Sequence, residues 1–289
     1  MNTTAHQNDF DYEVAFSRNI GLITAEEQHL IRKSVIAIPG MGGGGGSHLI
    51  ALVRQGFEKF KISDMDAYEL KNFNRQYGAR LDTVGRNKVE VMKEEALKIN
   101  PNCEFELFPD GINADNIEAF LRGVNLSVDA LDAFNVDTRR LYFNESLKRN
   151  IPVITTGPIG FGSAFLIFLP GGPTFDEYFA VHDRMSYMEK LLSFFVGLAP
   201  KMLQRGYMKR TNLEEKRGPS SMGSINICAG IMTIYALKIL LNKGTVHAVP
   251  YYHQFDVMHE KYVMKRLWFY NKNPLQQIKI KLAQYLVHD

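Results

Sequence analysis

Short apolar runs alternate with amphipathic stretches over the first 156 residues. Runs at residues 34–39, 59–63, 104–108, 126–130 and 151–156 have the length and branched side chains of buried strands. Between them, apolar residues recur at helical spacing at about 47–55, 87–99, 113–121 and 137–148. Strands that alternate with helices in this way predict a mainly parallel sheet with helices on both faces.

The pattern changes after Gly157. An apolar strand is expected at 163–169, followed by a segment rich in Met, Leu, Phe, Lys and Arg at 184–216. A long buried helix is expected near 222–240, followed by strands around 247–255 and 262–268 and a helical tail at 274–286. We therefore predict an α/β fold: a Rossmann-like, doubly wound and mainly parallel sheet with an antiparallel C-terminal extension.

The chain is expected to form one domain. Residues 1–12 are polar and predict a flexible tail, and residues 13–289 form the domain, with a variable crossover or insertion at about 170–218. Residues 219–237 carry no charge and approach the length of a membrane span. Several serines, Asn226 and two glycines lie among them, so a buried helix of a soluble core is the better interpretation.

Composition narrows the class of protein. The 289 residues carry a formal net charge of +3, which implies no sequence-wide attraction to nucleic acid or to an anionic membrane. Cys103 and Cys228 cannot make a disulfide framework or a four-cysteine zinc site. The N-terminus lacks the basic and apolar regions of a signal peptide, so we expect a cytoplasmic protein.

A glycine-rich turn follows the first strand. It contains Gly40, Gly42, Gly43 and Gly45 and leads into a helix. Such a turn lets phosphate approach the backbone, and the helix N-terminus favours an anion there. Five consecutive glycines are also compatible with a flexible loop, so the turn alone decides nothing.

Charged residues downstream of the turn favour a nucleotide site. Asp64 ends the second strand and suits ribose hydroxyls, while Arg75 and Lys88 lie beside the turn, where they suit phosphate oxygens. Asp132 follows the fourth strand, and its hard oxygens suit Mg²⁺. Two cations, a metal-binding carboxylate and the glycine turn together suit a triphosphate. Any one of these charged side chains, taken alone, is equally compatible with a solvent-exposed loop that binds nothing.

These motifs together resemble the ThiF/MoeB/E1-like (ubiquitin-activating-type) adenylyltransferase superfamily. The motifs are Gly40-x-Gly42-Gly43-x-Gly45, Asp64-x-Asp66, Asn72-x-x-Arg75-Gln76, Val84-Gly85-Arg86-x-Lys88, Asn100-Pro101 and Asp129-x-x-Asp132. The resemblance covers residues 15–160 well and residues 219–268 more loosely, whereas residues 170–218 match nothing in the family.

The resemblance implies an ATP-dependent enzyme that activates a carboxylate as an acyl-adenylate and releases pyrophosphate. By this analogy Asp64 binds the ribose, and Asn72, Arg75 and Lys88 contact the phosphates. Asp132 coordinates Mg²⁺, while the glycines, Asp66 and Gln76 belong to the cofactor-binding motifs. Arg18 matches an N-terminal arginine that reaches the partner's active site in a homodimer. The family's substrate is often the C-terminus of a ubiquitin-like or sulfur-carrier protein.

The chain also departs from the family. The zinc-binding Cys-x-x-Cys pairs of many members are absent, so no zinc is expected, and no cysteine lies at 170–218, where a thioester-forming nucleophile would be expected. Cys228 lies within the uncharged helix and is predicted to be an inert core thiol. Asp132 is followed by Ala133, where the family usually has Asn, and Arg139 is displaced by extra residues.

Two alternatives remain open. The first resembles the tRNA threonylcarbamoyladenosine dehydratases, which share the front half of the chain; the modest net charge gives tRNA binding little support. The second is a nucleotide-binding regulatory module without turnover, which the joint presence of Arg75, Lys88 and Asp132 argues against. The carboxylate substrate is not determined by the fold.

Overall fold

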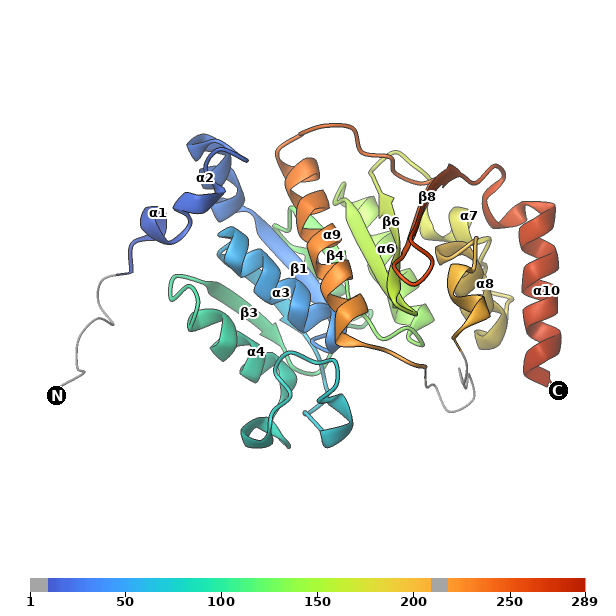
Figure 1. The fold of residues 1–289 in the computed structure, drawn as a ribbon, viewed down its shortest axis with the longest axis horizontal. Helices are drawn as coiled ribbons and strands as arrows, with labels where there is room; N and C mark the ends of the chain where they lie inside the picture. The colour runs from blue at the N-terminus through green and yellow to red at the C-terminus, as the bar shows by residue number, and fades with distance from the viewer. Residues whose placement is uncertain (1–9, 209–217, 289) are drawn as a thin grey trace.

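The computed structural model describes residues 10–208 and 218–288, which form one eight-stranded sheet with helices on both faces (Figure 1). The strand order is β3-β2-β1-β4-β5-β6-β7-β8. Strands β1 to β5 are parallel, and β6, β7 and β8 continue the sheet in antiparallel pairs. This arrangement confirms the predicted fold. The strands are β1 (Val35–Pro39), β2 (Lys59–Ser63), β3 (Glu104–Phe108), β4 (Leu126–Asp129), β5 (Val153–Ile159), β6 (Gly162–Phe168), β7 (Tyr251–Asp256) and β8 (Lys261–Arg266).

One face of the sheet is covered by α3 (Gly43–Gln55), α4 (Lys88–Leu97) and α9 (Met222–Leu240). Helix α2 (Ala25–Lys33) joins this core through Ile31, and a Thr24–Glu27 capping box starts it. Helix α9 is long and apolar enough to cross a membrane, but it packs against α3, β5 and β6. It is the core helix that the sequence predicted.

The other face carries α5 (Ile117–Leu121), α6 (Val136–Lys148), α7 (Phe175–Phe179) and α8 (Tyr187–Leu198). Helix α10 (Pro274–His288) packs on the outside of α8. The predicted insertion at 170–218 is therefore part of the main core where it is described, because Phe175, Phe179 and Leu191 are fully buried there. Its residues 209–217 lie outside the described residues.

Short helical segments complete the described chain. They are α1 (Tyr12–Ala15) and the 3-10 helices η1 (Ser17–Asn19), η2 (Leu70–Asn72), η3 (Leu81–Thr83), η4 (Leu203–Gly206) and η5 (Tyr270–Lys272). The predicted tail differs at its end: Asp11 caps α1, and Tyr12 is buried with its hydroxyl donating to the Gly56 carbonyl at 2.6 Å. Residues 1–9 of the predicted tail lie outside the described residues.

Candidate nucleotide site

The glycine turn joins β1 to α3 and needs glycine at two positions for steric reasons. Gly40 has φ of +93°, and a Cβ there would lie 2.3 Å from the Ala130 carbonyl oxygen. A Cβ on Gly45 would lie 1.7 Å from the Gly40 carbonyl oxygen. The turn is therefore a fixed close approach between backbone segments and not a flexible loop.

Helix α3 begins at Gly43, four residues earlier than predicted, so glycines form its whole first turn. A Cβ on Gly42 would lie 3.7 Å from Gln76 Nε2, and one on Gly43 would lie 3.1 Å from the Arg75 carbonyl oxygen. The loop with the predicted cations therefore closes over this first turn. The free backbone N–H groups at the start of a 13-residue helix form an anion-binding position.

Asp64, Asp66 and Lys88 form a charged cluster beside the turn. Asp64 Oδ2 accepts a hydrogen bond from the Met41 backbone N–H at 2.7 Å, and Asp64 Oδ1 accepts one from the Asp66 backbone N–H at 2.8 Å. The Lys88 ammonium is buried, 2.9 Å from Asp66 Oδ2 and 4.0 Å from Asp64 Oδ1. Burial raises the pKa of Asp64 above its ordinary value, and Lys88 offsets part of that rise.

The loop from Asp66 to Thr83 carries the three other predicted side chains. Asn72 is buried, its Oδ1 accepts from the Glu69 backbone N–H at 2.9 Å, and its NH₂ group can donate to a ligand. Arg75 donates through Nη1 to the Lys71 carbonyl at 2.9 Å and to Asn74 Oδ1 at 3.0 Å. Gln76 is buried, and its Oε1 has no hydrogen-bond partner among the described residues.

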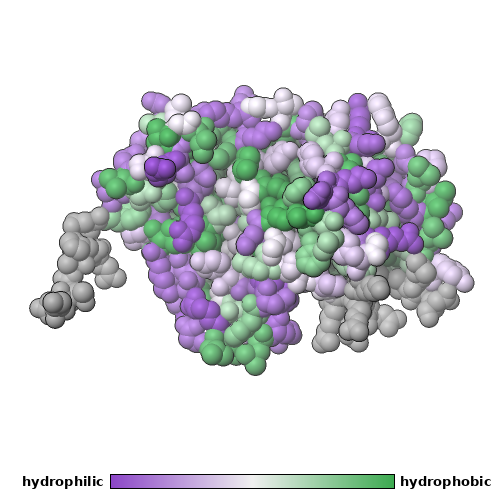
Figure 2. Space-filling model, in the orientation of Figure 1, coloured by the Kyte–Doolittle hydropathy of each residue, from purple (hydrophilic) through white to green (hydrophobic). Residues whose placement is uncertain are grey.

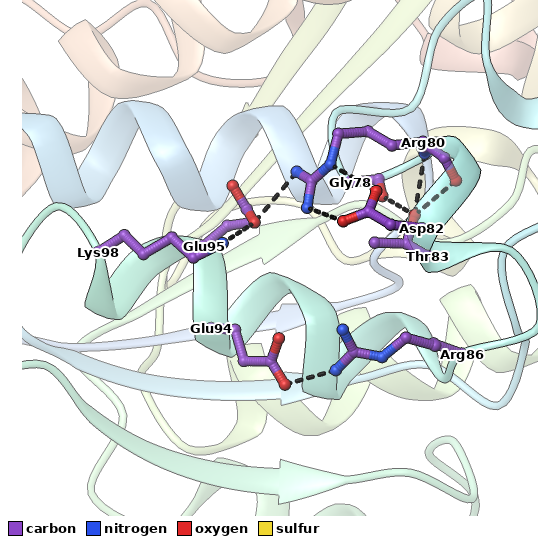
Figure 3. A network of polar contacts seen from close by, with 8 residues as sticks. All are labelled: Gly78, Arg80, Asp82, Thr83, Arg86, Glu94, Glu95 and Lys98. Carbon is purple, nitrogen blue, oxygen red and sulfur yellow. Dashed lines mark hydrogen bonds and ion pairs between the residues drawn. The ribbon is translucent and has the colours of Figure 1, made fainter.

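Figure 3 shows how the end of this loop is fixed to α4. The Arg80 guanidinium contacts Asp82 at 3.1 Å and Glu95 at 3.0 Å, and Thr83 Oγ1 donates to the Gly78 carbonyl at 2.6 Å. Arg86, which precedes α4, forms an ion pair with Glu94 on that helix. These contacts hold the loop against the helix that begins with Lys88.

Asp132 lies in the loop after β4, and a buried ion pair that the sequence analysis missed holds this loop. Asp132 is exposed, and its Oδ1 accepts from the Phe134 backbone N–H at 2.9 Å. Arg139 is buried and donates from Nε to Asp129 Oδ2 at 2.8 Å and from Nη2 to the carbonyls of Leu131 and Asp132 at 2.6 and 3.1 Å. An acid at the end of an apolar strand and an arginine on the next helix are the only sequence signals for this pair.

A second missed group lies behind the glycine turn. His48 on α3 is fully buried, and its Nε2 is 3.0 Å from Thr156 Oγ1 on β5. Burial lowers the pKa of His48 to about 3, so the ring is neutral at ordinary pH. The Oγ of Ser47 and the Nδ1 of His48 are buried without a partner among the described residues. The apolar environment of α3 gave no signal for a buried imidazole.

Cys228 has the properties of the inert thiol that was predicted. It is fully buried on α9, where its Sγ lies 3.2 Å from Ser163 Oγ. Burial raises the pKa of its thiol to about 12, so almost no thiolate forms at neutral pH.

Arg18 lies far from the other predicted site residues of the same chain. It is exposed on η1, and the adjacent Asn19 donates from Nδ2 to the Gln55 carbonyl at 3.0 Å, at the C-terminal end of α3. The glycine turn lies at the opposite end of this 13-residue helix, about 20 Å away at 1.5 Å per residue. Arg18 therefore cannot complete the site of its own subunit.

The structure thus brings the loops that carry the other predicted residues next to the start of α3. The glycine turn lies against the end of β4 at Ala130, against the Gln76 side chain at Gly42 and against the Arg75 carbonyl at Gly43, and the Met41 N–H donates to Asp64. Within residues 10–208 and 218–288, no three His, Cys, Asp or Glu side chains come together as a metal-binding group. Asp132 as a single carboxylate ligand stays a prediction.

Comparisons with known proteins agree with this arrangement. The tRNA threonylcarbamoyladenosine dehydratase of Haemophilus influenzae is 34% identical over 151 residues, which are 52% of this chain and 57% of that protein. The chain therefore matches little more than half the length of that relative. A probable molybdopterin-synthase adenylyltransferase of Porphyra purpurea is 23% identical over 272 residues, covering 90% of this chain and 63% of that protein.

Among solved structures, the crystal structure of PaaA superposes with a TM-score of 0.68 at 22% identity, over 92% of this chain and 77% of that one. That likeness concerns the fold alone. Residues 16–277 match the ThiF family, which is nearly the whole described domain. The chain belongs to the ThiF family.

Proposed function

We propose that the chain is an ATP-dependent adenylyltransferase that activates a carboxylate as an acyl-adenylate and releases pyrophosphate. The observation that carries the proposal is the meeting of Lys88, the Arg75–Gln76 loop and the Asp132 loop at one glycine turn. The similarity to a probable molybdopterin-synthase adenylyltransferase supports the reaction class.

The residues around the turn fit a nucleotide phosphate. Gly42 leaves space where a side chain would otherwise stand, next to the free N–H groups of the first turn of α3. Gln76 Oε1 is a buried acceptor without a partner among the described residues, and a ligand donor would satisfy it. Asp64 uses one hydrogen bond on each oxygen, so each oxygen can accept another from a ribose hydroxyl.

Asp132 fits the role of a Mg²⁺ ligand. Its carboxylate is exposed, it uses one oxygen to cap its own loop, and hard oxygen donors of this kind suit Mg²⁺. When bound, the ion would neutralise phosphate charge. Arg139 holds the backbone on both sides of this carboxylate, so the ligand is positioned by the fold.

The chemistry needs positioning and charge neutralisation, not a covalent protein group. A substrate carboxylate oxygen would form a bond to the α-phosphorus, the bond between that phosphorus and the bridging oxygen to the β-phosphate would break, and pyrophosphate would leave with the electron pair. Arg75 and Lys88 would stabilise the charge on the phosphate oxygens. The inert Cys228 gives no support for a subsequent thioester.

ATP–pyrophosphate exchange tests the proposal. The protein is assayed with Gly-Gly-ended carrier proteins and with small carboxylic acids. Exchange with at least one of them is expected, and Arg75→Ala should reduce it about 100-fold or more while the unfolding temperature is kept. Tight ATP binding without exchange for any substrate would instead favour the regulatory module.

We also propose a homodimer in which Arg18 completes the partner's site. The distance between Arg18 and the turn within one subunit supports this arrangement. Apolar side chains exposed on the site loop are suitable contacts, with Leu70 and Leu81 exposed by 65% and 82%. An equimolar mixture of Arg18→Ala and Lys88→Ala subunits should recover about a quarter of wild-type exchange, because half of the dimers regain one intact site. Absence of any recovery would contradict the shared site.

A second candidate is an enzyme like the tRNA threonylcarbamoyladenosine dehydratases, favoured by 34% identity to one of them. In that case the activated carboxylate would belong to the modified tRNA. Including tRNA that carries threonylcarbamoyladenosine in the exchange assay distinguishes this candidate, since it alone would then support exchange.

A further inference from the structure

Helix α10 presents a row of apolar side chains to the outside of the molecule. Leu275, Ile278, Leu282 and Tyr285 are exposed by 67%, 54%, 56% and 66%. Their spacing of three, four and three residues places them along one side of the helix. The buried side of α10 holds Gln276, whose Nε2 donates to the Val196 carbonyl of α8 at 3.1 Å. Figure 2 shows hydrophobic residues along the right-hand edge, where Figure 1 places α10.

Two aromatic residues extend this row at the start of α10. Trp268 and Phe269 are exposed by 61% and 74%. The Trp268 carbonyl accepts from Asn273 Nδ2 at 3.1 Å, just before the helix begins. All six side chains are large and expose apolar surface to solvent. We call these six residues the α10 face.

The surroundings of the α10 face are basic. Residues 261–288 contain no Asp or Glu, and four exposed cations lie on α10 or in the segment that leads into it: Lys265, Arg266, Lys272 and Lys281. Lys279 instead turns inward and donates to the Pro200 carbonyl at 2.6 Å. Arg266 lies over the Trp268 ring, 4.2 Å from its centroid. A second copy docked symmetrically on this face would bring these like charges together, which is unfavourable. The charge therefore indicates an anionic partner.

We propose that the α10 face binds the surface of an anionic lipid bilayer. Leu, Ile, Trp and Phe on one side of a helix, flanked by lysines, are typical of helices that lie in the headgroup region. Lysines are depleted in protein–protein interfaces, so their dominance here favours lipid over an acidic protein. Three of the six side chains are aliphatic and offer no stacking surface for nucleotide bases, and Arg266 already covers one face of Trp268.

In this arrangement the apolar row enters the interface while the lysines contact lipid phosphates. Each cation near such a surface adds to the attraction, and salt screens that contribution. The inference goes beyond the nucleotide reaction and does not depend on it. Such binding would hold the enzyme at a membrane surface. The attraction would come from the local cations beside α10, because the formal net charge of the whole chain is only +3.

Vesicle sedimentation of the full chain tests the proposal. Vesicles of phosphatidylcholine alone are compared with vesicles containing about 30% phosphatidylglycerol, at 0.1 M and 0.5 M NaCl. We expect binding to the anionic vesicles only, weakened about tenfold or more at the higher salt. The double variant Ile278→Gln/Leu282→Gln should lose most of this binding. Leu30→Gln is the matched control, because Leu30 on α2 is exposed by 56%, as Leu282 is.

Three results would overturn the proposal. The first is that the protein sediments equally with neutral and anionic vesicles, or that it sediments with neither. The second is binding that the double variant leaves unchanged while its unfolding temperature is that of the wild type. The third is that the double variant instead abolishes a self-associated state in analytical ultracentrifugation, or binding to a fluorescent single-stranded RNA probe. Pyrophosphate exchange is measured without vesicles, so its failure and the failure of lipid binding are separate outcomes.

Discussion

A methyl group on Gly45 would lie 1.7 Å from the Gly40 carbonyl oxygen, whereas one on Gly44 would lie 3.6 Å from His48 Nε2. We expect Gly45→Ala to destabilise the fold by about 3 kcal/mol or more, because backbone must shift. Gly44→Ala lies on the same helix turn and should be neutral or stabilising by up to about 1 kcal/mol. Urea denaturation of both variants measures the difference, and equal midpoints would contradict the close packing of the turn.

Protonation of His48 should couple folding to pH. Burial lowers the folded pKa to about 3, whereas the unfolded ring titrates near 6.5, so between these values the unfolded state binds the extra proton. Stability due to this group is therefore fully present above pH 6.5 and falls by about 1.4 kcal/mol per unit as the pH decreases toward 3. Urea denaturation of wild type and His48→Gln at pH 7.5 and 5.5 should show a smaller loss in the variant. Equal losses would mean that the ring is accessible to protons in the folded state.

At the scale of elements, the Asp132 loop depends on the Asp129–Arg139 pair between β4 and α6. Arg139 also lies over the Phe194 ring of α8, 4.4 Å from its centroid. Arg139→Met should destabilise the protein by about 3–5 kcal/mol, because Asp129 is left buried and unpaired. Asp129→Asn/Arg139→Met removes both charges and should recover part of the loss. Denaturation of both variants tests this, and an additive double variant would argue against the pair.

Sequence patterns predicted the elements whose causes are local. The strand runs and the glycine turn each depend on neighbouring residues. Helix α3 starts earlier than predicted because contacts with Ala130, Arg75 and Ile225 override the low helix propensity of glycine. The motifs also identified the residues that gather at the turn.

The partners of those residues could not be predicted in the same way. Asp129 meets Arg139 and Thr155, and His48 meets Thr156, only because the sheet order places β4 beside β5 and α3 across it. These contacts join positions up to 108 residues apart. A single sequence shows the residue types but not which of them meet. The exposure of the α10 face likewise follows from how α10 packs on α8, because its apolar spacing alone also fits a core helix.

At the scale of the whole molecule, the two cysteines report whether the domain opens as one unit. Cys103 belongs to the core on the α3 side near the β3 edge, and Cys228 lies on α9. Burial raises both thiol pKa values to about 12, so reaction with a thiol reagent requires opening. The variants Cys103→Ala and Cys228→Ala each keep one thiol, whose labelling reports the free energy of opening around it. If the chain is one cooperative domain, these two free energies should agree within about 1 kcal/mol.

Labelling kinetics at low urea give these two free energies. A much lower value for Cys103 would identify the β3 edge as a separately opening unit, which would contradict full cooperativity. Circular dichroism at the same urea concentrations controls for any destabilisation by the alanine substitutions.

If Lys88 binds the phosphates as we propose, its pairing with Asp66 would make that binding an exchange of counter-ions. The ammonium is already neutralised at 2.9 Å, so an incoming phosphate must displace a carboxylate before it gains the charge. Asp66→Asn would remove this internal competitor and also the repulsion between an acid and a polyphosphate. We expect the variant to bind ATP about tenfold more tightly by titration calorimetry, and weaker binding would show that Asp66 itself holds the nucleotide. Tighter binding by the variant would mean that Asp66 limits nucleotide affinity. Asp66 would keep the Lys88 ammonium in place in the empty enzyme and would influence how readily nucleotide is released after each turnover.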